Sequence, residues 1–132
     1  MKYLIDTDWV IDHFNNVKET TKKLEELAPE GMAIRIVSLA ELYEGIYYSK
    51  NPVKSQQLLE EFLVPDLKVL NIDEDVCKIF GKERGKLRKQ GRIISDFDLL
   101  ISATCLYYNL TLLTNNLRHY ERIEGLKILS IS

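Results

Sequence analysis

Short apolar segments alternate with longer amphipathic segments along the whole chain, and this alternation constrains the fold more than any other feature. The short segments are rich in Val, Ile and Leu, which is typical of strands buried on both faces of a parallel sheet. Parallel strands need crossover connections, and helices supply them. We therefore expect an α/β fold, with a mainly parallel central sheet of about five strands and helices on both faces. The predicted strands are residues 2–6, 32–37, 68–72, 110–114 and 127–131.

Helix-boundary residues lie between these strands. A predicted helix opens at Pro52 and ends at Pro65, and Gly91 stops another. Ser38 and Glu41 have the spacing of a capping box, so we expect a helix to start at Ser38. The other predicted helices are residues 8–15, 17–27, 73–90 and 95–108, with a short helical piece at 117–122.

Composition indicates one ordinary globular domain over residues 1–132, because no repeat or linker divides the chain. The 18 Lys and Arg residues against 20 Asp and Glu residues give a net charge of −2. This balance argues against a protein that binds nucleic acid through a globally basic surface. It leaves room for a local acidic pocket with a basic patch elsewhere.

Nothing in the sequence predicts a membrane segment or an export signal. No apolar run approaches the roughly 18 residues of a membrane span, and Asp6 comes too early for a secretory signal. Cys77 and Cys105 stand singly in apolar helical stretches without a C-x-x-C motif, so we expect two buried reduced thiols. We expect an intracellular, cytoplasmic protein with no membrane contact.

Acidic residues follow the predicted strands at the edge where sites form in such folds. Asp6 ends the first strand, Glu41 lies one turn beyond the second, and Asp96 and Asp98 start the helix before the fourth. Each acid also has a structural explanation, as a cap or as a partner of a helix dipole. We expect the four carboxylates to converge and share a divalent cation, and oxygen-only ligands favour Mg²⁺ or Mn²⁺.

Several segments resemble the motifs of one family, the PIN domains. Residues 4–7, 38–42 and 98–103 (LIDT, SLAEL and DLLISA) are similar to its three acidic motifs. Residues 112–116, followed by Arg118, Tyr120 and Ile123, are similar to its C-terminal motif. The ordered set covers essentially the whole chain, and the compact form resembles the VapC toxins of prokaryotic toxin–antitoxin pairs.

The resemblance implies a Mg²⁺- or Mn²⁺-dependent endoribonuclease. Asp6, Glu41 and Asp98 correspond to its acidic metal site, and Asp96 matches a further acid, with Asp98 favoured as the closer ligand. Many relatives carry an aspartate where this chain has Asn116, which weakens the expectation of a second metal. The resemblance also implies an RNA substrate, a small antitoxin that covers the pocket, and a homodimer.

Other residues have supporting roles in this interpretation. Thr7 and Asn115 are expected to hydrogen-bond near the phosphate. Tyr43, Tyr47 and Tyr48 could stack on RNA bases, but for Tyr43 and Tyr47 we favour packing or a contact with a second copy or the antitoxin. We expect His13 and His119 to be solvated or partly buried. A basic run is expected either to form a solvated helix face or to attract the RNA backbone. It consists of Lys82, Arg84, Lys86, Arg88, Lys89 and Arg92.

Two alternatives stay open from the sequence. Asp6 and Asp8 have the D-x-D spacing of phosphatases that use an aspartyl nucleophile, although no downstream lysine or acidic pair clearly matches. A PIN-like module that binds RNA or protein without cutting is also compatible with the loss of an acid at Asn116. The RNA target cannot be derived from the residues.

Overall fold

A five-stranded, fully parallel sheet forms the centre of the protein, as predicted. The computed structural model describes residues 1–63 and 67–131. The strand order is β3-β2-β1-β4-β5, and every neighbouring pair is parallel. The strands are β1 (Tyr3–Ile5), β2 (Met32–Arg35), β3 (Lys68–Leu70), β4 (Thr111–Leu113) and β5 (Lys127–Leu129).

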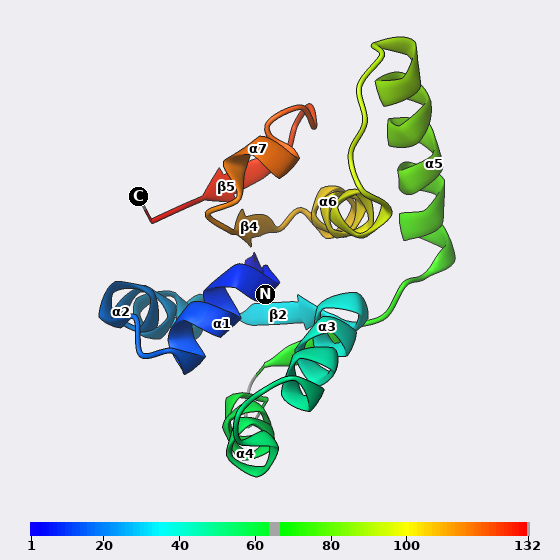
Figure 1. Ribbon diagram of the computed structural model, residues 1–132. Coiled ribbons are helices and arrows are strands. Elements are labelled where there is room, and N and C mark those ends of the chain that lie inside the picture. Colours follow the sequence, from blue (N-terminus) through cyan, green and yellow to red (C-terminus); the bar gives the residue numbers. More distant parts are fainter. Residues whose placement is uncertain (64–66, 132) are drawn as a thin grey trace.

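Helices cover both faces of the sheet (Figure 1). On one face lie α1 (Thr7–Phe14), α2 (Lys18–Leu27), α3 (Ile36–Tyr47) and α4 (Pro52–Phe62), with a 3-10 turn at Ala28–Glu30. On the other lie α6 (Asp96–Tyr108) and α7 (Leu117–Tyr120), and α5 (Glu74–Lys89) packs against α6. The expected end of a helix at Pro65 lies outside the described residues.

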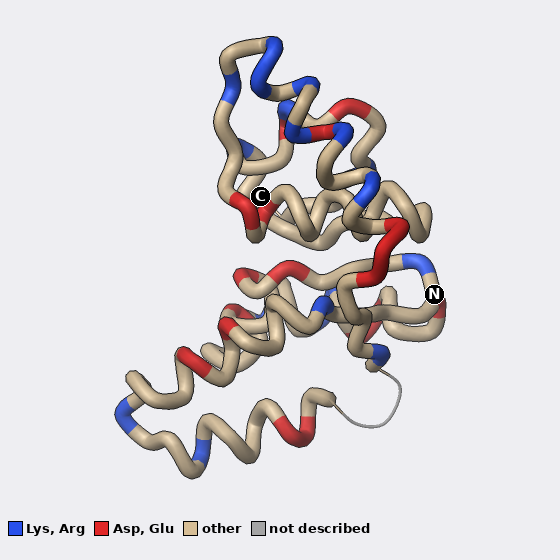
Figure 2. Tube along the Cα trace, turned by 90° about the vertical axis from the view of Figure 1, so that its right-hand side faces the viewer, with Lys and Arg blue, Asp and Glu red and all other residues tan. Residues whose placement is uncertain are grey.

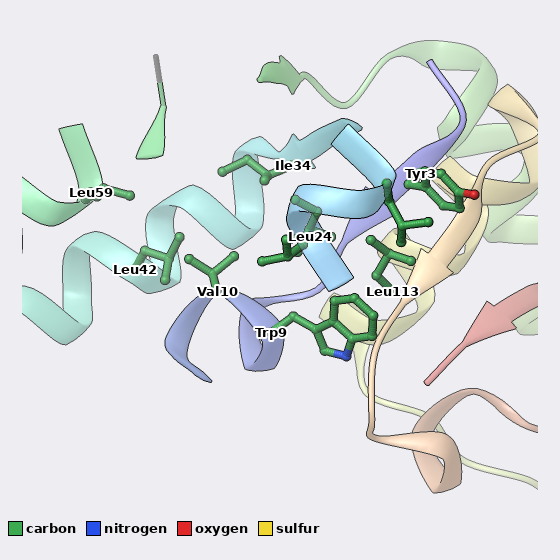
Figure 3. Close-up of a cluster of buried hydrophobic side chains, with 10 residues drawn as sticks. Tyr3, Trp9, Val10, Leu24, Ile34, Leu42, Leu59 and Leu113 are labelled. Atoms are coloured by element: carbon green, nitrogen blue, oxygen red, sulfur yellow. The ribbon is translucent and has the colours of Figure 1, made fainter. Parts of the chain in front are cut away.

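Alternation along β1 builds a core on each face. Tyr3 and Ile5 point into one buried cluster, while Leu4 points into the other. Figure 3 shows the first cluster, in which Trp9 and Val10 of α1 join Ile34 of β2 and Leu113 of β4. Each fully buried side chain of this kind contributes about 1.5–3 kcal/mol, so β1 is held firmly from both sides.

The junction between β2 and α3 differs from the sequence prediction. The strand predicted over 32–37 ends at Arg35, because β3 pairs only with residues 33–35, and α3 begins at once at Ile36. Ser38 therefore lies inside the first turn, and the N-cap position is Arg35, without a side-chain cap. The predicted capping box of Ser38 and Glu41 is wrong, so capping does not explain Glu41.

Other expectations are confirmed or corrected locally. Asp73 caps α5, and Gly91 follows its end with a φ of +67°, a conformation that glycine adopts without strain. Cys105 is buried as expected, but Cys77 is exposed, because it lies on the outer side of α5. Among the described residues, no helix is long and apolar enough to span a membrane.

Candidate active site

Three carboxylates from three separate elements meet at the carboxyl edge of the sheet. Asp6 directly follows β1, Glu41 lies on α3, and Asp98 lies in the first turn of α6. Two hydroxyl groups connect them. Thr7 Oγ1 donates to Glu41 Oε1 at 3.2 Å, and the Tyr120 hydroxyl lies 3.0 Å from Asp6 Oδ2 and 3.1 Å from Asp98 Oδ1. We call Asp6, Glu41 and Asp98 the carboxylate cluster.

Asp6 is the most enclosed member of the cluster, with 5% of its surface exposed. Its Oδ1 accepts a hydrogen bond from the Thr7 N–H at 2.9 Å, so it also caps α1. Its Oδ2 accepts from Thr114 Oγ1 at 2.8 Å and lies beside Tyr120. Together these contacts hold the Asp6 carboxylate in one orientation, as a binding site requires.

Tyr120 is the residue that couples Asp6 to Asp98, a role that only its place in the C-terminal motif indicates from the sequence. Its ring is buried, and its hydroxyl carries only one proton to donate. The hydroxyl can therefore satisfy one of the two carboxylates at a time. The other carboxylate faces an oxygen lone pair, which favours a proton or a cation at this point.

Burial and mutual repulsion shape the charges of the cluster. Burial raises the pKa of Asp6, hydrogen bonds from Thr114, Thr7 and Tyr120 oppose the rise, and the charge of Asp98 adds to it. Burial likewise raises the pKa of Glu41, with further increases from the charges of Asp6 and Asp98. Among the described residues, no lysine or arginine forms an ion pair with Asp6, Glu41 or Asp98.

Two basic side chains lie near the cluster. His119 Nδ1 lies 3.0 Å from Asp98 Oδ2 at the exposed side. Arg35 is fully buried, and its guanidinium has no hydrogen-bond partner among the described residues. Burial lowers the pKa of Arg35, while Cys105 and Tyr120 act in the opposite direction. His13 instead contacts Thr21 and Phe62, so the two histidines do not share a cleft.

Asp8 lies beside the carboxylate cluster, and the metal-site interpretation of the sequence did not include it. Its Oδ2 accepts from the Asn115 N–H at 2.8 Å, and Thr114 Oγ1 lies 3.4 Å from both of its carboxylate oxygens. Burial raises the pKa of Asp8 to about 6 despite the Asn115 bond, and the nearby charge of Asp6 contributes. Its position two residues after Asp6 was the available signal, because both side chains face the end of β4.

Asp96 lies outside the carboxylate cluster. Its carboxylate pairs with the Arg84 guanidinium, and 78% of its side chain is exposed. Asp96 and Asp98 are two residues apart on one helix, so their side chains point about 200° apart. They cannot both face the same site. The structure thus brings three of the four predicted acids together, and the predicted preference for Asp98 agrees with this arrangement.

The expected supporting residues occupy different places. Thr7 lies in the cluster. Asn115 is exposed, but its side-chain oxygen accepts from Trp9 Nε1 at 3.1 Å and from the Ile131 N–H at 2.7 Å, so it fastens the C-terminal segment. The Asn116 N–H donates to Thr114 Oγ1 at 3.1 Å, and its side chain does not cap α7. A phosphate contact from these residues stays a prediction.

The aromatic and basic residues singled out from the sequence lie on the surface. Tyr43, Tyr47 and Tyr48 are exposed, with Tyr47 at 86%, so internal packing does not account for them and a contact with a partner or with RNA stays a prediction. The reason is that α3 buries Leu42 and turns its tyrosines outward. The basic run follows α5 and the loop after it, and Lys86 pairs with Glu83 at 3.3 Å.

A divalent metal fits the chemistry of the cluster. Among the described residues, no three His, Cys, Asp or Glu side chains stand close enough together to hold an ion without rearrangement. The donor set is nevertheless three carboxylates with repelling charges, which is the oxygen-only set that Mg²⁺ and Mn²⁺ prefer. The Tyr120 hydroxyl stands between Asp6 and Asp98, and the Thr7 hydroxyl bonds to Glu41. The three carboxylates would therefore have to move closer together to hold a metal.

Comparison with known proteins gives one consistent result. A model of the PIN domain matches residues 3–126. The chain is 36% identical over 129 residues to Ribonuclease VapC1 of Methanocaldococcus jannaschii, covering 96% of this chain and 86% of that protein. It is 31% identical over 127 residues to the tRNA(fMet)-specific endonuclease VapC of Shigella flexneri, covering 96% of each. The crystal structure of VapBC2 from Rickettsia felis bound to a promoter DNA fragment is similar over 100% of both chains, at 30% identity and a TM-score of 0.91.

Proposed function

Because the chain belongs to the PIN-domain family, and within it to the VapC-type proteins, we propose that it is a metal-dependent endoribonuclease and the toxin of a toxin–antitoxin pair. Relatives of matching length are named ribonucleases or a tRNA-specific endonuclease. The family membership also removes the aspartyl-phosphatase alternative. The single observation that carries the proposal is the convergence of Asp6, Glu41 and Asp98 at one edge of the sheet.

A bound Mg²⁺ or Mn²⁺ would lower the pKa of water and neutralise charge on the scissile phosphate. Asp6 and Asp98 are the residues we propose as direct ligands. Thr114 and Tyr120 hold Asp6 in one orientation. Asp96 is not needed in this scheme, because it is paired with Arg84.

Glu41 has a separate role in the proposal. Thr7 orients its Oε1, and burial together with the charges of Asp6 and Asp98 raises its pKa. A carboxylate with a raised pKa accepts a proton more readily, which suits a residue that orients the attacking water. The remaining chemistry needs no protein nucleophile.

An antitoxin partner is supported by the shape of the surface next to the cluster. An apolar groove of about 250 Å³ runs between α1, α3 and α4, with Glu41 at its rim. Its apolar lining consists of Ile11, Phe14, Leu42, Ile46 and Leu59. An apolar segment of an antitoxin seated there would reach the carboxylate cluster. A homodimer is proposed from the resemblance, and the exposed tyrosines of α3 are candidates for either contact.

The function is tested by cleavage of labelled RNA by the purified protein. We expect cleavage with Mg²⁺ or Mn²⁺, little with Ca²⁺, whose looser coordination misplaces the water, and none in excess chelator. Asp98→Asn should lower the rate at least about a hundredfold, or roughly 3 kcal/mol of barrier. Asp96→Asn is the matched variant, with the same charge change on the same helical turn, and should retain far more activity.

Two results would contradict the proposal. Full activity in chelator would exclude the metal mechanism. RNA binding without cleavage under any metal would favour the non-cleaving module, the alternative that Asn116 keeps open.

A further inference from the structure

The structure divides the basic run of α5 into two sides. Arg84 and Arg88 are four residues apart, so they stack along one side of the helix, and Arg92 follows in the loop. These three arginines line a cleft of about 460 Å³ together with residues 93–96. The three lysines of the run, Lys82, Lys86 and Lys89, do not line it.

Arg84 builds this cleft and is not available to a ligand. One of its guanidinium nitrogens donates to the Ile94 carbonyl at 2.8 Å, and the other pairs with Asp96. Arg84 thereby ties the loop to α5 and compensates the one carboxylate in the cleft. Among the described residues, Arg88 and Arg92 form no ion pair. The cleft therefore presents two uncompensated guanidinium groups.

The cleft lies beside the carboxylate cluster. Asp96 lines the cleft and Asp98 belongs to the cluster, and both occupy the first turn of α6. Figure 2 shows Lys and Arg gathered at the end of the molecule formed by α5 and the loop that follows it. The three carboxylates of the cluster repel an anionic chain that reaches them. The arginine-lined cleft on the other side of the same helical turn attracts it.

We propose that the cleft binds a backbone phosphate of single-stranded RNA through Arg88 and Arg92, next to the phosphate cleaved at the carboxylate cluster. This inference rests on the proposed function. One guanidinium group can donate two parallel hydrogen bonds to two oxygens of a phosphate, and a lysine ammonium group cannot reproduce that geometry. The cleft thus positions the RNA by its backbone and carries no sequence information.

The test is the affinity of the full chain for a labelled single-stranded RNA in chelator, measured by fluorescence anisotropy over a range of KCl concentrations. Arg88→Gln/Arg92→Gln should reduce the salt slope by about 0.7, because the two arginines together hold one phosphate and each phosphate contact of a single strand contributes roughly 0.7. Arg88→Lys/Arg92→Lys keeps the charge but loses the paired geometry, so its slope should match wild type while its affinity falls several-fold. Lys18→Gln/Lys22→Gln, an equal charge change on α2, should leave both quantities unchanged.

Three outcomes would overturn the inference. A Lys82→Gln/Lys89→Gln variant that loses as much affinity as the arginine variant would indicate diffuse attraction along α5. Full affinity of the Arg88→Lys/Arg92→Lys variant would show that RNA binding does not need the paired hydrogen bonds of a guanidinium group. An equal loss for a duplex DNA of the same length would indicate a general phosphate site outside an RNA path.

Cleavage measurements separate this inference from the proposed function. Wild-type protein that binds RNA through the cleft but cuts none with Mg²⁺ would refute the function and leave the cleft assignment standing. Wild-type protein that cuts RNA, with the arginine variant unchanged in binding and cutting, would refute the cleft assignment alone.

Discussion

Neutralising Asp98 should stabilise the protein in the absence of metal, which is the opposite of the usual effect of changing a partly buried residue. The Tyr120 hydroxyl lies 3.0 Å from Asp6 Oδ2 and 3.1 Å from Asp98 Oδ1, so these oxygens are at most about 6 Å apart. At an effective dielectric constant of about 20, two unit charges at that separation repel by roughly 3 kcal/mol. Solvent at the exposed side of Asp98 reduces this to about 1–2 kcal/mol.

Asp98→Asn keeps the side-chain shape and an acceptor for Tyr120, but it loses the ion pair with His119. That pair is half-exposed and contributes at most about 1 kcal/mol. The net gain is about 1 kcal/mol, which corresponds to a rise in Tm of roughly 3–5 °C for a domain of this size. Differential scanning calorimetry in chelator measures this directly.

Asp96→Asn is the control for the calorimetry. Both acids lie in the first turn of α6, so both variants lose the same favourable interaction with the helix dipole. Asp96 lies outside the cluster, and its variant should melt at or slightly below the wild-type temperature. An Asp98→Asn protein that melts no higher than Asp96→Asn would refute the repulsion within the cluster. Mg²⁺ at ten times its Kd should stabilise wild type by about 1.4 kcal/mol, and Asp98→Asn by less.

Two further predictions follow from burial. Burial raises the pKa of Asp8 to about 6, well above its ordinary value, so the folded state binds this proton more tightly than the unfolded state. In chelator, the free energy of unfolding should therefore fall as the pH rises from about 4 to about 6 and then level off. Between pH 5 and neutrality the fall should be roughly 1 kcal/mol. Urea unfolding measures this pH dependence, and Asp8→Asn should reduce it. Cys77 is exposed and Cys105 is buried with a raised pKa, so a thiol reagent should label only Cys77 until the protein unfolds; rapid labelling of both thiols in the native protein would contradict the burial of Cys105.

Local pattern was enough to predict the architecture and the identity of the acids. Alternation of short apolar strands with amphipathic helices predicts a parallel sheet, and in such a sheet the residues after β1 and β2 meet at one edge. Asp6, Glu41, Asp96 and Asp98 could therefore be named as candidates from their positions, and the preference for Asp98 over Asp96 came from the family resemblance. The helix boundaries at Asp73 and Gly91 were also predictable, because capping depends on residues close together in the sequence.

Tertiary contacts decided the rest of the site, because they join residues far apart in the chain. Tyr120 lies 114 residues from Asp6, and Asn115 lies 107 residues from Asp8, so no periodicity links them. The start of α3 at Ile36 depends on where β3 stops pairing with β2. The difference between Asp96 and Asp98 depends on which side of α6 packs on the sheet: one acid faces the carboxylate cluster, and the other faces the arginines of α5.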